Sequence, residues 1–183
     1  MAEFESLETL LLLEMSRRNS DMLVDLVYQQ PKLFEELFQI FLRNEEPVSR
    51  RAAWVIDILT EKMPELLFPY NEIIVRTLPS FSHDGLKRHS LRMIARAGLP
   101  PEELLGKLIN TCFAWLLSPE ESVAVKVHSM EILYQISQTE PALKKELADS
   151  ISWRIHEETP GFKNKGFKLL RNLYSEIEIL NIK

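Results

Sequence analysis

Two series of residues recur along this chain at nearly the same interval. Prolines suited to the first turn of a helix are separated by 33, 37 and 40 residues; they are Pro31, Pro64, Pro101 and Pro141. A second motif, a base, two variable residues, a small residue and a large apolar one, places its small residue at positions 53, 90, 129 and 166. Repeats of this length in a chain with helical apolar spacing indicate pairs of helices.

The chain is therefore expected to be all-α, a right-handed α-α superhelix of about five antiparallel helix pairs. The predicted helices span 3–18 and 20–29, 31–43 and 47–62, 65–79 and 84–97, 101–117 and 122–138, and 141–157 and 161–175. Ser20 and Asp21 are expected to cap the second helix, and Pro69 to break or kink the fifth. One domain is expected over 1–183, with 1–30 as an atypical capping unit, 31–175 as the repeats and 176–183 as a tail.

The second helices resemble those of the HEAT repeat (armadillo-type) family of α-solenoids. The family places an apolar residue, a base, two further residues and a small residue there, as in Val125-Lys126-x-x-Ser129 and Phe162-Lys163-x-x-Gly166. The first copy departs from this pattern, because Ser49 precedes Arg50. The resemblance covers about residues 31–175, and it implies a surface that binds a partner without specifying which.

The basic residues of the motif have two interpretations. The family resemblance implies a ladder in which each base pairs with an acid in a turn; these bases are Arg50, Lys87, Lys126 and Lys163, and the acids are Glu46, Asp84, Glu121 and Glu158. The alternative is a basic stripe that binds a ligand. The ladder is preferred for these four bases, and a partner is expected to contact neighbouring side chains of the second helices instead, namely Arg51, Trp54, Arg88, Arg92 and Lys165.

Few residues suggest chemistry. Asp57 stands where the other copies have an apolar residue, and it is expected to share a local polar face with Arg50 and Glu61. Cys112 lies at core spacing and is expected to be a buried, inert thiol, and His89 and His128 lack the further ligands of a metal site. No phosphate-binding loop, nucleophile elbow or other catalytic signature occurs, so neither an enzyme nor a cofactor is predicted.

The remaining expectations concern partners and location. Trp115 and Trp153 are 38 residues apart and are expected to occupy equivalent positions, in the core or in a groove. The expected function is a non-catalytic scaffold that binds a protein or peptide in a concave groove. The alternative is a nucleic-acid-binding or repair protein similar to the HEAT-like alkylpurine DNA glycosylases, whose tryptophan and aspartate resemble Trp54 and Asp57; the net charge of -5 disfavours it. The sequence has neither a signal peptide nor a membrane span, which predicts a cytoplasmic protein.

Overall fold

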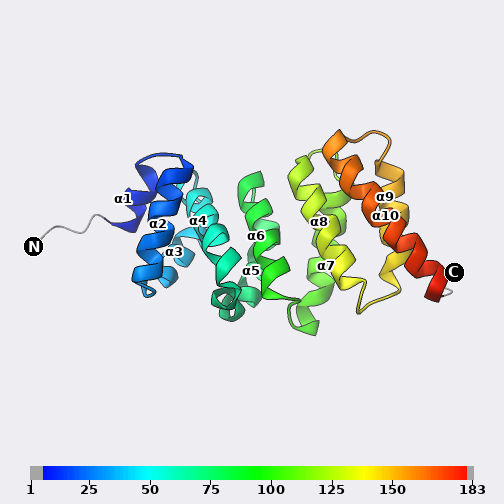
Figure 1. Cartoon of the computed structure of the whole chain (residues 1–183), viewed down its shortest axis with the longest axis horizontal. Helices are drawn as coiled ribbons and strands as arrows, with labels where there is room; N and C mark the ends of the chain where they lie inside the picture. Colours follow the sequence, from blue (N-terminus) through cyan, green and yellow to red (C-terminus); the bar gives the residue numbers. More distant parts are fainter. Residues whose placement is uncertain (1–5, 181–183) are drawn as a thin grey trace, which may run out of the picture. The chain divides into compact units, whose positions relative to one another are not determined.

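The computed structural model describes residues 6–180, and every regular element within them is helical. Figure 1 shows helices following one another along the chain in antiparallel pairs. The α-helices are α1 (Leu7–Leu12), α2 (Arg17–Gln29), α3 (Leu33–Leu42), α4 (Val48–Lys62), α5 (Asn71–Thr77), α6 (Asp84–Ala97), α7 (Glu102–Leu117), α8 (Val123–Ile136), α9 (Leu143–Arg154) and α10 (Pro160–Leu180). The structure confirms the predicted all-α repeat fold.

The chain forms two compact units, residues 1–97 and residues 98–183, called here the N-terminal and C-terminal units. In the N-terminal unit α3 packs on α4, and the second helices α2, α4 and α6 follow one another side by side. In the C-terminal unit α7 packs on α8, α9 packs on α10, and α8 and α10 are neighbours. Gly98 directly follows α6 with a φ of 91°, a left-handed conformation that glycine adopts without strain.

The first predicted helix is wrong. Residues 3–5 of the predicted span 3–18 lie outside the described residues, and α1 ends at Leu12. The Ser16 side chain then caps α2 by accepting a hydrogen bond from the Asn19 amide at 3.0 Å. Ser20 is no cap, because it is buried inside α2, three residues after the base Arg17.

Two other predicted elements differ from the structure, whereas α3, α4, α6, α7, α8 and α9 end within three residues of expectation. The predicted helix 65–79 is divided into a 3-10 segment, Pro64–Tyr70, then α5, then a second 3-10 segment, Leu78–Ser80, and Pro69 lies inside the first of these. The last helix continues to Leu180, through the first part of the predicted tail 176–183; residues 181–183 lie outside the described residues.

The small residues of the repeat motif are buried because another helix lies against them. A Cβ atom on Gly166 would lie 3.1 Å from the Ile155 side chain and 3.2 Å from the Ile151 side chain, so α9 approaches α10 too closely for a larger residue. Ala53, Ser90 and Ser129 are likewise fully buried. The motif therefore marks the line along which the two helices of a pair meet.

Two single residues settle further expectations about the core. Cys112 is fully buried on α7, as predicted, and burial raises the pKa of its thiol, which disfavours the reactive thiolate. Trp115 and Trp153 do not occupy equivalent positions, since Trp115 is 9% exposed and Trp153 is 68% exposed. Their spacing in the sequence matches the repeat only approximately, and a shift of one residue turns a helical side chain by about 100°.

Candidate functional site

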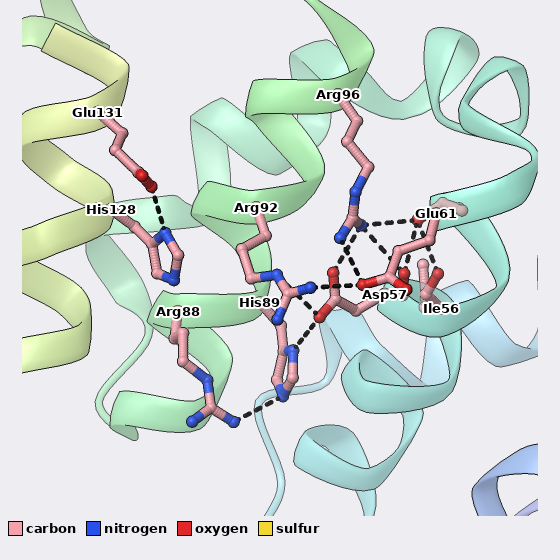
Figure 2. A network of polar contacts seen from close by, with 10 residues as sticks. Ile56, Asp57, Glu61, Arg88, His89, Arg92, Arg96, His128 and Glu131 are labelled. Carbon is pink, nitrogen blue, oxygen red and sulfur yellow. Dashed lines mark hydrogen bonds and ion pairs between the residues drawn. The ribbon is translucent and has the colours of Figure 1, made fainter. Parts of the chain in front are cut away.

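A buried carboxylate joins α4 to α6 in the N-terminal unit. Asp57 on α4 is 2% exposed, and Figure 2 shows three cationic or imidazole side chains of α6 converging on it. Its carboxylate is 2.8 Å from His89 Nδ1, 2.6 Å from Arg96 Nη1 and 3.3 Å from Arg92 Nε. Burial by itself would raise the pKa of Asp57, but these partners outweigh it and hold the pKa below its ordinary value.

His89 in this cluster is a neutral imidazole. Arg88 Nη2 lies 3.1 Å from His89 Nε2, and since a guanidinium only donates, Nε2 accepts this hydrogen bond. The proton then resides on Nδ1, which donates to Asp57. Burial agrees with this assignment, because it keeps the pKa of His89 below its ordinary value despite the attraction of the Asp57 carboxylate.

The outer rim of the cluster contains a second acid. Glu61 accepts from Arg92 at 2.6 Å and from Arg96 at 3.3 Å. The predicted link between Asp57 and Glu61 is therefore present, through shared arginines, whereas Arg50 pairs with Glu46 at 2.9 Å instead of joining them. We refer to Asp57, Glu61, His89, Arg92 and Arg96 as the α4–α6 cluster.

A second buried carboxylate joins repeats in the C-terminal unit. Glu158, in the turn before α10, accepts from Lys126 of α8 at 2.7 Å and from Arg154 of α9 at 2.5 Å. Both cations and the acid are almost completely shielded from solvent. Burial would raise the pKa of Glu158, but the hydrogen bonds from Lys126 and Arg154 hold it below its ordinary value. We call these three residues the Glu158 triad.

Two more polar ties connect α8 to its neighbours. Glu131 accepts from His128 at 2.7 Å and pairs with Lys165 of α10, and the hydrogen bond from His128 is the main cause that lowers the pKa of Glu131 to about 2. Glu176 of α10 accepts from the Tyr134 hydroxyl at 2.6 Å and pairs with Lys144 of α9. The contact at Glu176 explains why α10 extends beyond its predicted end.

The four predicted ladder bases behave differently from one another. Arg50 and Lys126 each bind a turn acid, Glu46 in the same repeat and Glu158 in the following one. Lys87 is half-buried at the start of α6, and Lys163 has no ion pair within residues 6–180. Sequence reasoning missed a fifth equivalent base, Arg17, which pairs with Asp21 at 2.8 Å; the signal was its spacing of three residues from Ser20.

The side chains expected to contact a partner are mostly occupied within the chain. Arg51 donates to the Leu11 carbonyl oxygen at 2.9 Å, Arg88 bonds His89, and Arg92 and Lys165 form ion pairs. Trp54 is half-buried against the connection between α1 and α2. The structure does not bring these five residues together as one free surface within either unit.

A groove between α2 and α4 is the feature that sequence reasoning missed. It has a volume of about 550 Å³, within the size range of ligand-binding clefts. Its lining comprises Arg17, Asp21, Val24, Asp25 and Tyr28 of α2 with Ile58, Leu59, Glu61, Lys62 and Met63 from the end of α4. The available signal was the spacing of Val24 and Tyr28, which places two large apolar side chains on one face of α2.

Other kinds of site find no support in the part of the chain that the structure describes. Within residues 6–180 no three or more His, Cys, Asp or Glu side chains gather in a way that could hold a metal ion. The same range contains no helix with the length and apolar character needed to cross a bilayer.

Comparison with known proteins gives one result. A family model described as a HEAT repeat domain matches residues 7–171. No curated protein and no solved structure matches the chain.

Proposed function

Because this chain belongs to the HEAT repeat family, we propose that it is a non-catalytic scaffold whose α2–α4 groove binds a segment of another protein. Stacked helix pairs present extended surfaces of this kind, and the second helices that form the groove are the ones expected to face a partner. The observation that carries the proposal is the groove itself, which combines an apolar floor with a charged rim.

The composition of the groove suggests the chemistry of the segment. Val24, Ile58 and Met63 form apolar walls, and Tyr28, 66% exposed, has the ring and hydroxyl favoured in protein interfaces. Asp25 on the rim has no ion pair within residues 6–180. A helical or extended segment with an apolar anchor beside a lysine or arginine matches these features.

The non-catalytic part of the proposal rests on the state of the reactive groups. The Asp57 carboxylate is buried and already bound by three side chains, so a substrate would have to displace them before it reached the acid. The Cys112 thiol is buried with a raised pKa, which disfavours the thiolate needed for nucleophilic attack. These arguments also weaken a glycosylase role for Trp54 and Asp57.

A nucleic-acid-binding role draws less support than protein binding. Such a role requires cations free to approach phosphates, whereas three of the five residues expected to contact a partner, Arg51, Arg92 and Lys165, are bound internally. The overall charge of -5 adds to this argument.

Site-directed photo-crosslinking tests the groove. A photoreactive phenylalanine analogue replaces Val24 in the groove, and a control protein carries it at the exposed Ile73 of α5. In native extract we expect a discrete protein adduct from position 24 alone. Excess unlabelled wild-type chain should suppress this adduct, whereas a competitor with Tyr28→Glu should not. Equal adducts from both positions, or none from position 24, would refute the groove as the binding site.

A further inference from the structure

We propose that the outer face of α10 binds the α1–α2 end of a second copy of this chain, so that copies associate head to tail. The surface of α2 that this interface uses shares Asp21 and Asp25 with the rim of the α2–α4 groove, but the inference does not rest on the proposed function. The outer face of α10 is defined here by Lys163, Phe167, Lys168, Arg171 and Tyr174.

The first step is the equivalence of α8 and α10. A shift of 37 residues superimposes the buried positions of the two helices. The paired residues are Val125 with Phe162, Ser129 with Gly166, Ile132 with Leu169, Leu133 with Leu170 and Ile136 with Leu173, and every one of them is buried. Where two other equivalent positions differ in exposed fraction, the difference therefore indicates that a neighbouring element covers that position on one helix and not on the other.

The covered positions of α8 become exposed in α10. Met130 and Ser137 are fully buried, whereas their equivalents Phe167 and Tyr174 are 59% and 52% exposed. The buried Lys126, bound to Glu158, corresponds to Lys163, which has no ion pair within residues 6–180. On α8 this side is covered by the following helix pair, α9 and α10. On α10 it is largely exposed, although the Tyr174 hydroxyl lies 2.9 Å from the Ser152 hydroxyl of α9.

The uncovered face is both cationic and aromatic. Lys163, Lys168 and Arg171 form no ion pair with any described residue, although the whole chain has a net charge of -5. Exposed aromatic rings beside unpaired cations suit a partner that supplies apolar side chains together with carboxylates. By analogy with Lys126 and Glu158, the carboxylate that Lys163 requires comes from the turn between two helices.

The α1–α2 end of the chain supplies this chemistry. Its turn contains Glu14, which has no ion pair with a described residue, between the exposed Leu13 and Met15. The outer side of α2 forms a shallow hollow lined by Met22 and Leu26 together with the charged side chains of Arg18, Asp21 and Asp25, of which Asp21 is paired with Arg17 and Asp25 has no ion pair within residues 6–180. A second copy thus presents the carboxylates of Glu14 and Asp25, neither of them in an ion pair within residues 6–180, beside exposed apolar side chains to the basic, aromatic face of α10.

The two surfaces differ from each other and associate head to tail, so a dimer leaves one free surface of each kind, to which a further copy can bind. Sedimentation velocity of the 183-residue chain should therefore show a sedimentation coefficient that rises with protein concentration. High salt should reduce the association, because the contact joins opposite charges.

Two variants with different broken surfaces provide the decisive experiment. Phe167→Ser with Arg171→Glu disables the α10 face, and Met22→Lys disables the α2 face. Each variant alone should be monomeric, with association weakened about tenfold or more. An equimolar mixture has only one functional junction, between the intact α10 face of the Met22→Lys protein and the intact α2 face of the other. It should form 1:1 dimers and nothing larger.

Thermal melts monitored by circular dichroism establish that both variants are folded, and crosslinking from position 24 measures groove binding separately. A wild-type chain that remains monomeric up to high concentration would overturn the proposal. A mixture that does not associate would do the same, since it would indicate a symmetric contact. Binding of a single-stranded oligonucleotide to the wild-type α10 face without self-association would assign that face to nucleic acid instead.

Discussion

The α4–α6 cluster and the Glu158 triad connect successive repeats with buried carboxylates, but they do so with opposite polarity. In the N-terminal unit the acid, Asp57, belongs to the earlier helix and the cations to the later one. In the C-terminal unit the earlier helix supplies the cation, Lys126, and the acid lies in the turn that follows α9. At both junctions a buried carboxylate is neutralised by cations, and either the earlier or the later repeat can provide the acid.

The difference follows from what each ladder base binds. Arg50 turns back to Glu46 in its own repeat and does not bind an acid of the next repeat. Asp57 then provides the tie from a position where other repeats have Ile94, Leu133 and Leu170. The two clusters also differ in solvent access, because Arg92 and Glu61 reach the surface whereas the Glu158 triad is enclosed. We expect the enclosed cluster to be the less tolerant of substitution.

The largest expected effect is that of Glu158→Gln. It leaves Lys126 and Arg154 buried without a carboxylate, and loss of one partner from a buried ion pair costs about 3 kcal/mol of unfolding free energy. Urea denaturation followed by circular dichroism measures this loss. Glu157→Gln, at the exposed neighbouring position, is the matched control and should be neutral. Equal stabilities of the two variants would show that the triad contributes nothing.

Asp57→Leu should have a smaller effect, about 2 kcal/mol, although it removes a more highly connected acid. Arg92 and Arg96 retain Glu61 and access to water, and His89 is already neutral. The introduced leucine also restores the apolar residue found at this position in other repeats. The same urea titration measures this loss of stability, and Glu61→Gln is the control because it alters only the exposed acid of the α4–α6 cluster. A loss as large as that of Glu158→Gln would contradict the importance of solvent access.

The helix pairs could be predicted from the sequence, whereas the boundary between α1 and α2 could not. The repeat period indicated the helix pairs because the repeats bury their residues at similar spacing, and prolines lie at the starts of α4, α7 and α10. The α1–α2 region failed because Leu10 to Leu13 continue the helical apolar spacing across a turn. Nothing in local spacing shows that Ser16, and not Ser20, caps α2.

Individual partners were harder to predict than the kind of interaction. The sequence identified Lys126 as a ladder base and Glu158 as a turn acid, and the structure pairs them. It did not predict that Asp57 would bind α6, because the helical wheel reports only neighbours on the same helix. The α2–α4 groove was missed for the same reason, since its two walls are separated in the sequence.

Glu131, which forms half-buried ion pairs with His128 and Lys165, is expected to make the stability of the chain depend on pH. Its pKa of about 2 lies below the ordinary 4.5, so its stabilising effect is complete above pH 4.5 and is lost as the pH falls toward 2. Because the side chain is 35% exposed, solvent screening limits this contribution to about 1 kcal/mol. Glu131→Gln should flatten the stability profile over this range relative to wild type, and the exposed Glu103→Gln should not. Parallel profiles for wild type and Glu131→Gln would exclude the effect.

The smallest expected effect is that of Lys163→Gln. Comparing this variant with Lys126→Gln separates the stabilisation that comes from a carboxylate partner from that of the lysine's position in the repeat. Lys126 and Lys163 occupy equivalent places in α8 and α10, but only Lys126 has a carboxylate within residues 6–180. Lys126→Gln should lower the melting temperature measurably, whereas Lys163→Gln should change stability by less than about 0.5 kcal/mol in dilute protein. Melting at high protein concentration extends the test. If Lys163 binds a second copy, as proposed, the two variants should then behave more alike, because association stabilises only the wild-type residue at position 163.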